Sequence, residues 1–78
     1  MLLDIVSPDK SIFSGEVKSI QLPGMAGSFG ILNNHAPLIS TLKSGKIKIK
    51  EPSGKELSFQ INGGVVEVQK NKVIILSE

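Results

Sequence analysis

The sequence predicts an all-β fold, a sandwich or barrel of short antiparallel strands with no substantial helix. Apolar and polar residues alternate with a period of two in several runs, as where Leu57, Phe59 and Ile61 are separated by polar residues. Turn residues recur at intervals of roughly 8–12 positions. No stretch of about 11 or more residues carries a helical apolar stripe free of Gly and Pro.

The ends of the strands are marked by clusters of residues that favour turns. Gly, Pro, Asn, Asp and Ser supply the backbone angles and local hydrogen bonds that turns need. Turns are therefore expected at Pro8-Asp9, Ser14-Gly15, Pro23-Gly24, Lys43-Ser44-Gly45, Pro52-Ser53-Gly54, Asn62-Gly63-Gly64 and Lys70-Asn71.

The first long strand contains a change of phase. Phe13 and Val17 share one parity, whereas Ile20 and Leu22 have the other, so a straight strand would not keep all four on one face. We expect a bulge or bend near Lys18–Ser19 that carries the strand from one sheet to the other. Two separate strands with a turn at the same place are the alternative.

The segment from Pro23 to Leu42 is the least strand-like part of the chain. Loops on a rigid sheet scaffold commonly carry function. We therefore expect functional loops here, where short apolar pieces lie among Gly24, Gly27, Gly30, Asn33, Asn34, His35 and Pro37.

Residues 46–50 predict a strand with one wet face, because Ile47 and Ile49 alternate with lysines. Charged strands also suit the edge of a sheet. The alternative function is a nucleic-acid-binding β-barrel, in which a strip of lysines contacts phosphates. The strip consists of Lys43, Lys46, Lys48, Lys50 and Lys55. The chain has no Tyr, no Trp and only three Phe on which bases would stack, so a solvated face is the preferred interpretation.

The last strands are apolar on both faces, at Val65–Val66 and from Val73 to Leu76. A strand of a two-layer fold should keep one face in water. These strands are therefore either central and covered, or their outer face is an interface. We favour an interface, because 78 residues are too few to supply a covering layer.

Composition and motifs argue against catalysis and against a bound metal or cofactor. There is no cysteine, only one histidine and no arginine, and the net charge is +2. The Gly24-x-x-Gly27-x-x-Gly30 pattern is not followed by a helix that would hold an anion, and His35 has no G-x-S-x-G nucleophile to pair with. Lys10 lies too near the start to match the mid-domain lysine of lipoyl carriers. No transmembrane run or signal peptide is visible, which favours the cytoplasm.

An ordered set of motifs runs through the whole chain, and the most specific is Asn34-His35-Ala36-Pro37-Leu38. The others are Leu3-Asp4-Ile5-Val6-Ser7-Pro8, Ile12-Phe13-Ser14-Gly15-Glu16-Val17, Leu22-Pro23-Gly24, Gly27-Ser28-Phe29-Gly30-Ile31-Leu32, Gly45-Lys46-Ile47, Gly63-Gly64-Val65-Val66-Glu67-Val68 and Asn71-Lys72-Val73. In order and spacing the set resembles the N-terminal β domain of the epsilon subunit of F-type ATP synthase, called delta in mitochondria.

The resemblance implies a ten-stranded sandwich of two five-stranded, mostly antiparallel sheets. It also implies a non-catalytic subunit of the central rotor stalk, which binds the gamma subunit with one side and the polar loops of the membrane c-ring with loops at its base. The expected c-ring-facing residues are Gly27, Ser28, Phe29, Asn33, Asn34, His35 and Ala36. The predicted anchors on gamma come from the strands that are apolar on both faces. They are the outward side chains among Val65, Ile74 and Leu76, and the sequence does not show which residue of each pair faces out.

We further expect one domain over residues 1–78, without the family's C-terminal helical hairpin, lying peripherally at the cytoplasmic face of a bacterial inner membrane. Two positions depart from the family pattern. Ser28 stands where an acidic residue is frequent. Asn34 stands where glycine is usual, so asparagine must adopt the left-handed backbone conformation there.

Overall fold

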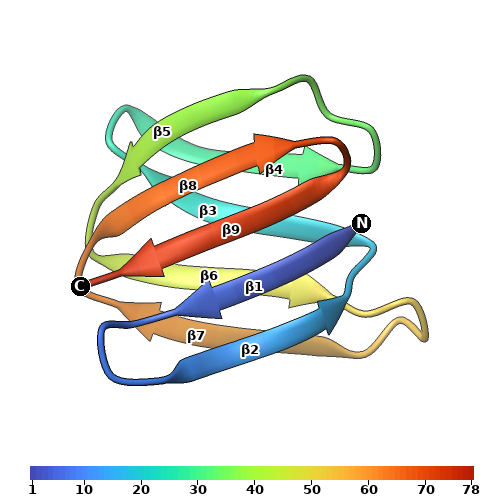
Figure 1. Ribbon diagram of the computed structural model, residues 1–78, viewed down its shortest axis with the longest axis horizontal. Coiled ribbons are helices and arrows are strands. Elements are labelled where there is room, and N and C mark those ends of the chain that lie inside the picture. The colour runs from blue at the N-terminus through green and yellow to red at the C-terminus, as the bar shows by residue number, and fades with distance from the viewer.

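All regular structure in the computed structural model, which describes residues 1–78, is β-strand, and it contains no helix, as predicted (Figure 1). In chain order the strands are β1 (Leu2–Val6), β2 (Ser11–Glu16), β3 (Ser19–Gly24), β4 (Gly27–Leu32), β5 (Leu38–Leu42), β6 (Gly45–Lys50), β7 (Glu56–Ile61), β8 (Gly64–Gln69) and β9 (Lys72–Ser77).

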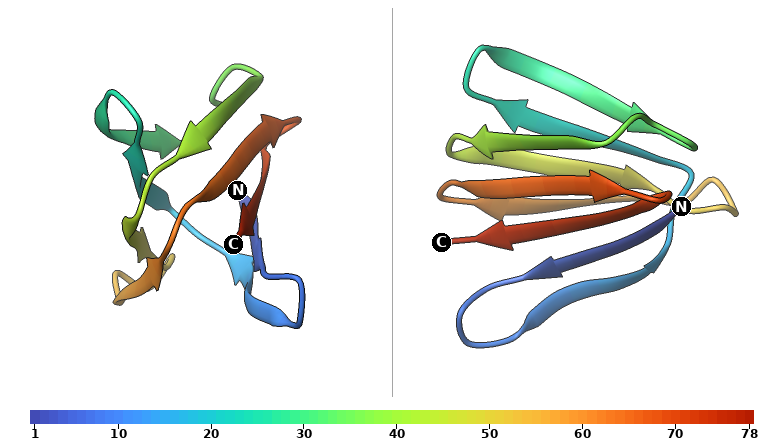
Figure 2. Two further views of the ribbon diagram at one scale, coloured as in Figure 1. Left: turned by 90° about the vertical axis from the view of Figure 1, so that its left-hand side faces the viewer. Right: turned by 45° about the horizontal axis from the view of Figure 1, so that its top comes forward.

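The strands form one continuous curled sheet in the order β2-β1-β9-β8-β5-β3-β6-β7, and β4 also pairs with β3. Only β1 and β9 run parallel, so the expectation of mostly antiparallel pairing is confirmed. Gly24 and Leu42 form the only pair that joins β3 to β5. On one side of this junction lie β2, β1, β9, β8 and β5, and on the other lie β4, β3, β6 and β7. Figure 2 shows the two halves curling to face each other.

Two details of the expected architecture are wrong: there are nine strands rather than ten, and one curled sheet rather than two separate five-stranded sheets. The expected turn at Ser14–Gly15 lies inside β2, where Gly15 pairs with Leu3. The halves are joined because the end of β3 reaches β5. There the Lys43 amide also donates a 2.9 Å hydrogen bond to the Pro23 carbonyl.

The change of phase lies where it was expected. The favoured form, a bulge or bend within one long strand, is wrong, and the alternative of two separate strands is what the structure shows. The connecting residues Val17 and Lys18 bond to opposite halves of the sheet. The Val17 amide donates to the Met1 carbonyl at 2.9 Å, and the Lys18 amide donates to the Lys50 carbonyl at 2.7 Å. The chain therefore crosses from one half to the other at this point, between β2 and β3.

The segment from Pro23 to Leu42 holds more strand than the sequence indicates, since both β4 and β5 lie in it. β4 pairs with β3 along its whole length, from Ser19 opposite Leu32 to Gly24 opposite Gly27. No strand pairs with the other side of β4. The glycines of β4, Gly27 and Gly30, take part in this backbone pairing although they bring no side chain to pack.

The core lies between the two halves and is almost entirely aliphatic. Fifteen buried residues form one cluster: Met1, Leu3, Ile5, Val17, Ile20, Leu22, Ile31, Leu42, Ile47, Ile49, Ile61, Val66, Val68, Val73 and Ile75. At the free ends of the curl, β2 and β7 are linked by side chains instead of backbone bonds. The Phe13 and Phe59 ring centroids lie 5.7 Å apart at an interplanar angle of 53°, a tilted arrangement that aromatic pairs favour.

Candidate interaction surfaces

The outer side of the half that contains β5, β8, β9 and β1 is an exposed apolar surface, called here the apolar face. Val65 lies opposite Leu76, and these two side chains are 39% and 54% exposed. Ile74 points to the same side and is half-buried. All three expected gamma-facing residues therefore point outward, while Val66, Val73 and Ile75 fill the core. The strands are central in the sheet, and their outer side is left uncovered.

Two further exposed apolar residues extend this face, and neither was singled out from the sequence. Ile39 in β5 is 72% exposed and Leu2 in β1 is 51% exposed. That these two side chains lie on the same side of the sheet as Val65 becomes known only from the register of β5 on β8 and of β1 on β9. The apolar face consists of Leu2, Ile39, Val65, Ile74 and Leu76.

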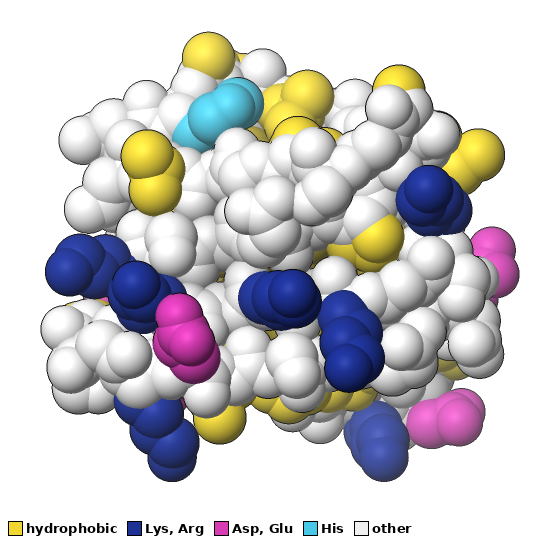
Figure 3. Space-filling model, turned by 180° about the vertical axis from the view of Figure 1, so that it is seen from behind, with side chains coloured by type: hydrophobic (Ala, Val, Ile, Leu, Met, Phe, Trp, Pro, Cys, Tyr) yellow, Lys and Arg dark blue, Asp and Glu magenta, His cyan; other side chains and the backbone are white.

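The outer side of the other half is polar and basic, and is called here the lysine face. Lys46 and Lys48 are exposed, so the predicted wet face of this strand is confirmed. The predicted edge position is wrong, because β6 lies between β3 and β7. Charges on alternate residues indicate which face meets water, but they do not indicate which strands lie on either side. Figure 3 views the molecule from the side opposite to Figure 1 and shows lysine side chains spread across it.

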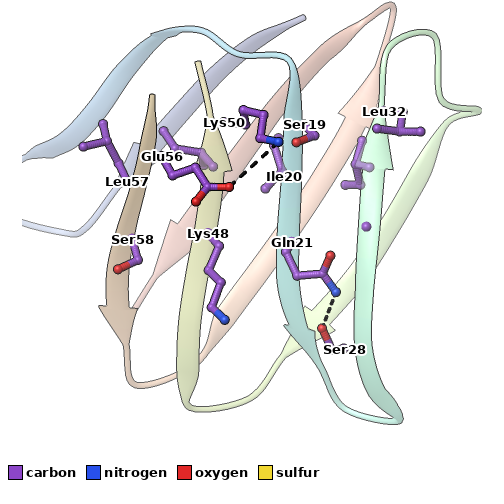
Figure 4. Close-up of a pocket in the computed structure, with 13 residues that line it drawn as sticks. Ser19, Ile20, Gln21, Ser28, Leu32, Lys48, Lys50, Glu56, Leu57 and Ser58 are labelled. Carbon is purple, nitrogen blue, oxygen red and sulfur yellow. Dashed lines mark hydrogen bonds and ion pairs between the residues drawn. The ribbon is translucent and has the colours of Figure 1, made fainter. Parts of the chain in front are cut away.

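A shallow depression crosses the lysine face between β4, β3, β6 and β7 (Figure 4). Its polar side chains bond mainly to one another: the Gln21 Nε2 donates to the Ser28 Oγ at 2.5 Å, and the Lys50 Nζ lies 3.8 Å from the Glu56 carboxylate. Figure 4 shows Lys48 and Ser58 alongside these pairs. Four of the polar side chains that line the depression are therefore paired with one another.

The expected ring-facing residues fall into two stretches at opposite ends of β4. Gly27, Ser28 and Phe29 begin the strand, while residues 33–36 follow it. Because β4 is an edge strand, both stretches lie along one margin of the molecule, the upper one in Figure 1. We call this the β4 margin. Phe29 is half-buried and packs against the core, so its ring does not face outward with Gly27 and Ser28.

The loop after β4 adopts the backbone conformation expected from its sequence. Asn34 has a φ of 61°, in the left-handed region that the sequence predicted for it. Its amide donates a 2.8 Å hydrogen bond to the Asn71 Oδ1. His35 is exposed, and its Nδ1 lies 2.7 Å from the Ala36 carbonyl oxygen. The imidazole thus interacts only with its own loop and is free to contact a partner.

Two exposed apolar residues flank the β4 margin and were missed from the sequence. Met25, in the turn between β3 and β4, is 64% exposed, and Leu32, at the end of β4, is 65% exposed. The position of Met25 beside the expected Pro23-Gly24 turn was the available signal, because a large apolar residue at a turn meets solvent. For Leu32 the sequence carries no comparable signal, since Ile31 beside it is fully buried.

The chain's first residue ties the β4–β5 loop to the opposite half of the sheet. The ammonium group of Met1 donates to the Glu16 Oε2 at 2.6 Å, to the Asn33 Oδ1 at 2.8 Å and to the Val17 carbonyl at 3.1 Å. The Met1 side chain is buried in the core. Asn33 is therefore a structural anchor of the loop as well as an expected contact residue, which its sequence position did not reveal.

The side chains include no group of three or more His, Cys, Asp or Glu arranged to hold a metal ion. No helix is long and apolar enough to cross a membrane. What the molecule presents is an apolar face, a lysine face and a margin with one imidazole and two exposed apolar side chains.

Comparison with known proteins agrees with this fold over the whole chain. A family model described as "ATP synthase, Delta/Epsilon chain, beta-sandwich domain" matches residues 1–78. The ATP synthase epsilon chain of Chlorobium limicola is 53% identical over 76 residues, which cover 97% of this chain and 86% of the relative. That of Dichelobacter nodosus is 47% identical over 74 residues, or 95% of this chain but 52% of the relative.

Solved structures show the same likeness. A chain of the mitochondrial ATP synthase of Euglena gracilis superposes with a TM-score of 0.90 at 26% identity, covering 96% of this chain and 48% of that one. A chain from the central stalk and c-ring of the Tetrahymena thermophila mitochondrial enzyme has a TM-score of 0.82 at 22% identity, which shows the shared fold. This chain spans about half the length of the Euglena chain. It belongs to the delta/epsilon family of ATP synthase.

Proposed function

We propose that this domain connects the gamma subunit to the c-ring of a rotary ATP synthase, so that torque passes between proton flow and the nucleotide sites. The observation that carries the proposal is the uncovered apolar face in a chain of this family. The fifteen buried residues form one core, so residues 1–78 would move as a single rigid unit.

The apolar face is the proposed gamma-binding side. Val65, Ile74 and Leu76 lie next to one another on β8 and β9, and Ile39 extends the surface onto β5. A surface with this many exposed apolar side chains is typical of a protein interface. Because the strands beneath it are central and hydrogen-bonded on both edges, the surface should change little when the partner binds.

The β4 margin is the proposed c-ring-facing side. An edge-on orientation of the domain would bring both ends of β4 to the ring, with Ser28 near one end and His35 near the other. Met25 and Leu32 add exposed apolar area at the same ends. In this orientation the domain lies at the cytoplasmic face of a bacterial inner membrane and is attached only through the complex.

The alternative, a nucleic-acid-binding barrel, lacks support. Phe13, Phe29 and Phe59 all pack against the core, so the lysine face offers no exposed aromatic ring on which a base would stack. The positive charge of the lysines in the depression on that face is also partly neutralised, because Lys50 forms an ion pair with Glu56. The lysines are best explained as the solvated side of the domain.

Affinity purification from the native membrane fraction tests the proposal. A tag after Glu78 leaves the hydrogen-bonded amino terminus free, and we expect gamma and c subunits to be recovered with the tagged chain. A Val65→Asp/Leu76→Asp variant is expected to lose gamma, because two carboxylates would be buried without partners. Recovery of neither subunit with the unmodified chain would overturn the proposal.

A further inference from the structure

Glu67 is a charged residue set inside the apolar face. In the sheet it lies directly between Ile39 of β5 and Ile74 of β9. Residues opposite one another in adjacent strands point to the same side, so the carboxylate projects among exposed apolar side chains. Glu67 is exposed, and its side chain makes no hydrogen bond and no ion pair within the chain.

The other strand carboxylates of this half, Glu16 and Asp4, are already compensated, and Glu16 accepts a 2.6 Å hydrogen bond from the Met1 ammonium. Asp4 lies next to Ile74 on the far side from Glu67. It accepts a 2.6 Å hydrogen bond from the Ser14 Oγ, and the Lys72 Nζ lies 3.9 Å from it. A partner protein that covers Asp4 would therefore lose little free energy by removing water from its carboxylate. Glu67 has no such partner, so it is the one charge on this face that a docking protein must satisfy.

Covering an ionised carboxylate without a partner is costly, because the group loses its water and gains nothing in exchange. A partner that covers Val65 and Ile74 would also remove water from Glu67, which lies beside Ile74. The penalty is avoided only if the partner brings a hydrogen-bond donor or a cation to this position. Arginine and lysine are the side chains that satisfy a carboxylate best in such a setting.

We infer that the gamma surface that covers the apolar face carries a lysine or arginine opposite Glu67, and that this pair sets the register between the two subunits. The inference rests on the proposed function, since it takes gamma as the occupant of this face. A consequence follows for the choice of side: Lys46 and Lys48 on the lysine face would repel such a cation, whereas the unpaired Glu67 attracts it to the apolar face.

The test is the affinity of the purified gamma subunit for the unmodified chain and for Glu67→Gln and Glu67→Leu. We expect Glu67→Gln to weaken binding about 10-fold or more, because the cation of gamma loses its charged partner. Glu67→Leu should weaken it at least as much, although it adds apolar area. Glu56→Gln, a change of the same type on the lysine face, is the matched control and should leave the affinity unchanged.

Whether Glu67→Leu weakens or strengthens gamma binding decides whether a cation of gamma faces Glu67. If no cation faces Glu67, then Glu67→Leu enlarges the apolar contact and binds gamma as tightly as the unmodified chain or more tightly, which overturns the inference alone. Failure of the unmodified chain to bind gamma overturns both the inference and the proposed gamma contact. Self-association through this face, seen as a dimer that Glu67→Leu strengthens in sedimentation, also overturns the inference. An unchanged thermal midpoint in all three variants confirms that folding is not the cause.

Discussion

Gly64 begins β8 at a point where the neighbouring backbone leaves no room for a side chain. A Cβ built on Gly64 would overlap the Leu76 carbonyl oxygen and lie 3.1 Å from the Ser77 Cα. These are backbone atoms of a paired strand, so they cannot rotate away as the tip of a side chain does. The close approach lies at the end of the apolar face, where the register of β8 on β9 is set.

The substitution Gly64→Ala should therefore lower the free energy of unfolding by about 2 kcal/mol or more, as overpacking does. Gly30→Ala is the matched control, because its Cβ would meet only the Gln21 Oε1 at 3.4 Å and the Ile20 carbonyl at 3.6 Å. It should change stability by no more than about 0.5 kcal/mol. Urea denaturation of both variants measures the difference, and equal midpoints would contradict this account of Gly64.

Residue-level features differ in how well the sequence predicts them. The left-handed conformation of Asn34 was predictable, because it depends on the local chain and on the intrinsic tolerance of asparagine. The contacts of the Met1 ammonium with Glu16 and Asn33 were not, because these groups are 15 and 32 positions away along the chain. Only the fold brings them together.

β9 shows how one element serves both the core and the surface. Ile75 is fully buried, and the next residue, Leu76, is 54% exposed on the apolar face. Alternation along a strand places them on opposite sides of the sheet. The same chemical change at two adjacent positions should therefore affect different properties.

We expect Ile75→Ala to lower the free energy of unfolding by about 2–5 kcal/mol, because it leaves a cavity in the core. Leu76→Ala should cost less than about 1 kcal/mol in stability but weaken gamma binding by roughly 10-fold, as truncation of an interface anchor does. Chemical denaturation and binding to purified gamma separate the two effects. Unchanged gamma affinity for Leu76→Ala would remove Leu76 from the proposed interface.

The sequence indicated that β9 is apolar on both sides, and from this we predicted an interface. It could not show which side faces out, since that depends on the register with β1 and β8. The strand from Gly45 to Lys50 shows the same limit. Its lysines correctly predicted a wet face. One neighbour, β7, is the next strand along the chain, but the other, β3, is separated from it in the chain by β4 and β5, and alternation along one strand does not encode that pairing.

At the scale of the whole molecule, the β4 margin and the apolar face are separate surfaces of one rigid body. Ser28 and His35 lie on the margin, are exposed, and contribute nothing to the core. If the margin faces the c-ring, these side chains act in coupling and not in folding. Their removal then tests the orientation of the domain in the complex.

The Ser28→Ala/His35→Ala variant should reduce ATP-driven proton pumping in reconstituted membranes by about twofold or more, on the scale of two lost polar contacts. Its thermal midpoint should stay near that of the unmodified chain. Ser58→Ala, an exposed serine on the lysine face, is the control and should pump normally. Full pumping by the double variant would remove the margin from the coupling path.

By itself the sequence determined the all-β class, most of the turns, the crossing near Lys18 and the strands whose two apolar faces make an interface available. These follow from local chemistry: alternation, turn propensity and phase are properties of neighbouring residues. The tertiary structure decided the number of strands, the single junction at Gly24 and Leu42 that makes one curled sheet, and the outward position of Glu67 among apolar side chains. These depend on which distant strands pair and in what register, and a side chain's surroundings on a sheet come from neighbouring strands far away in the chain.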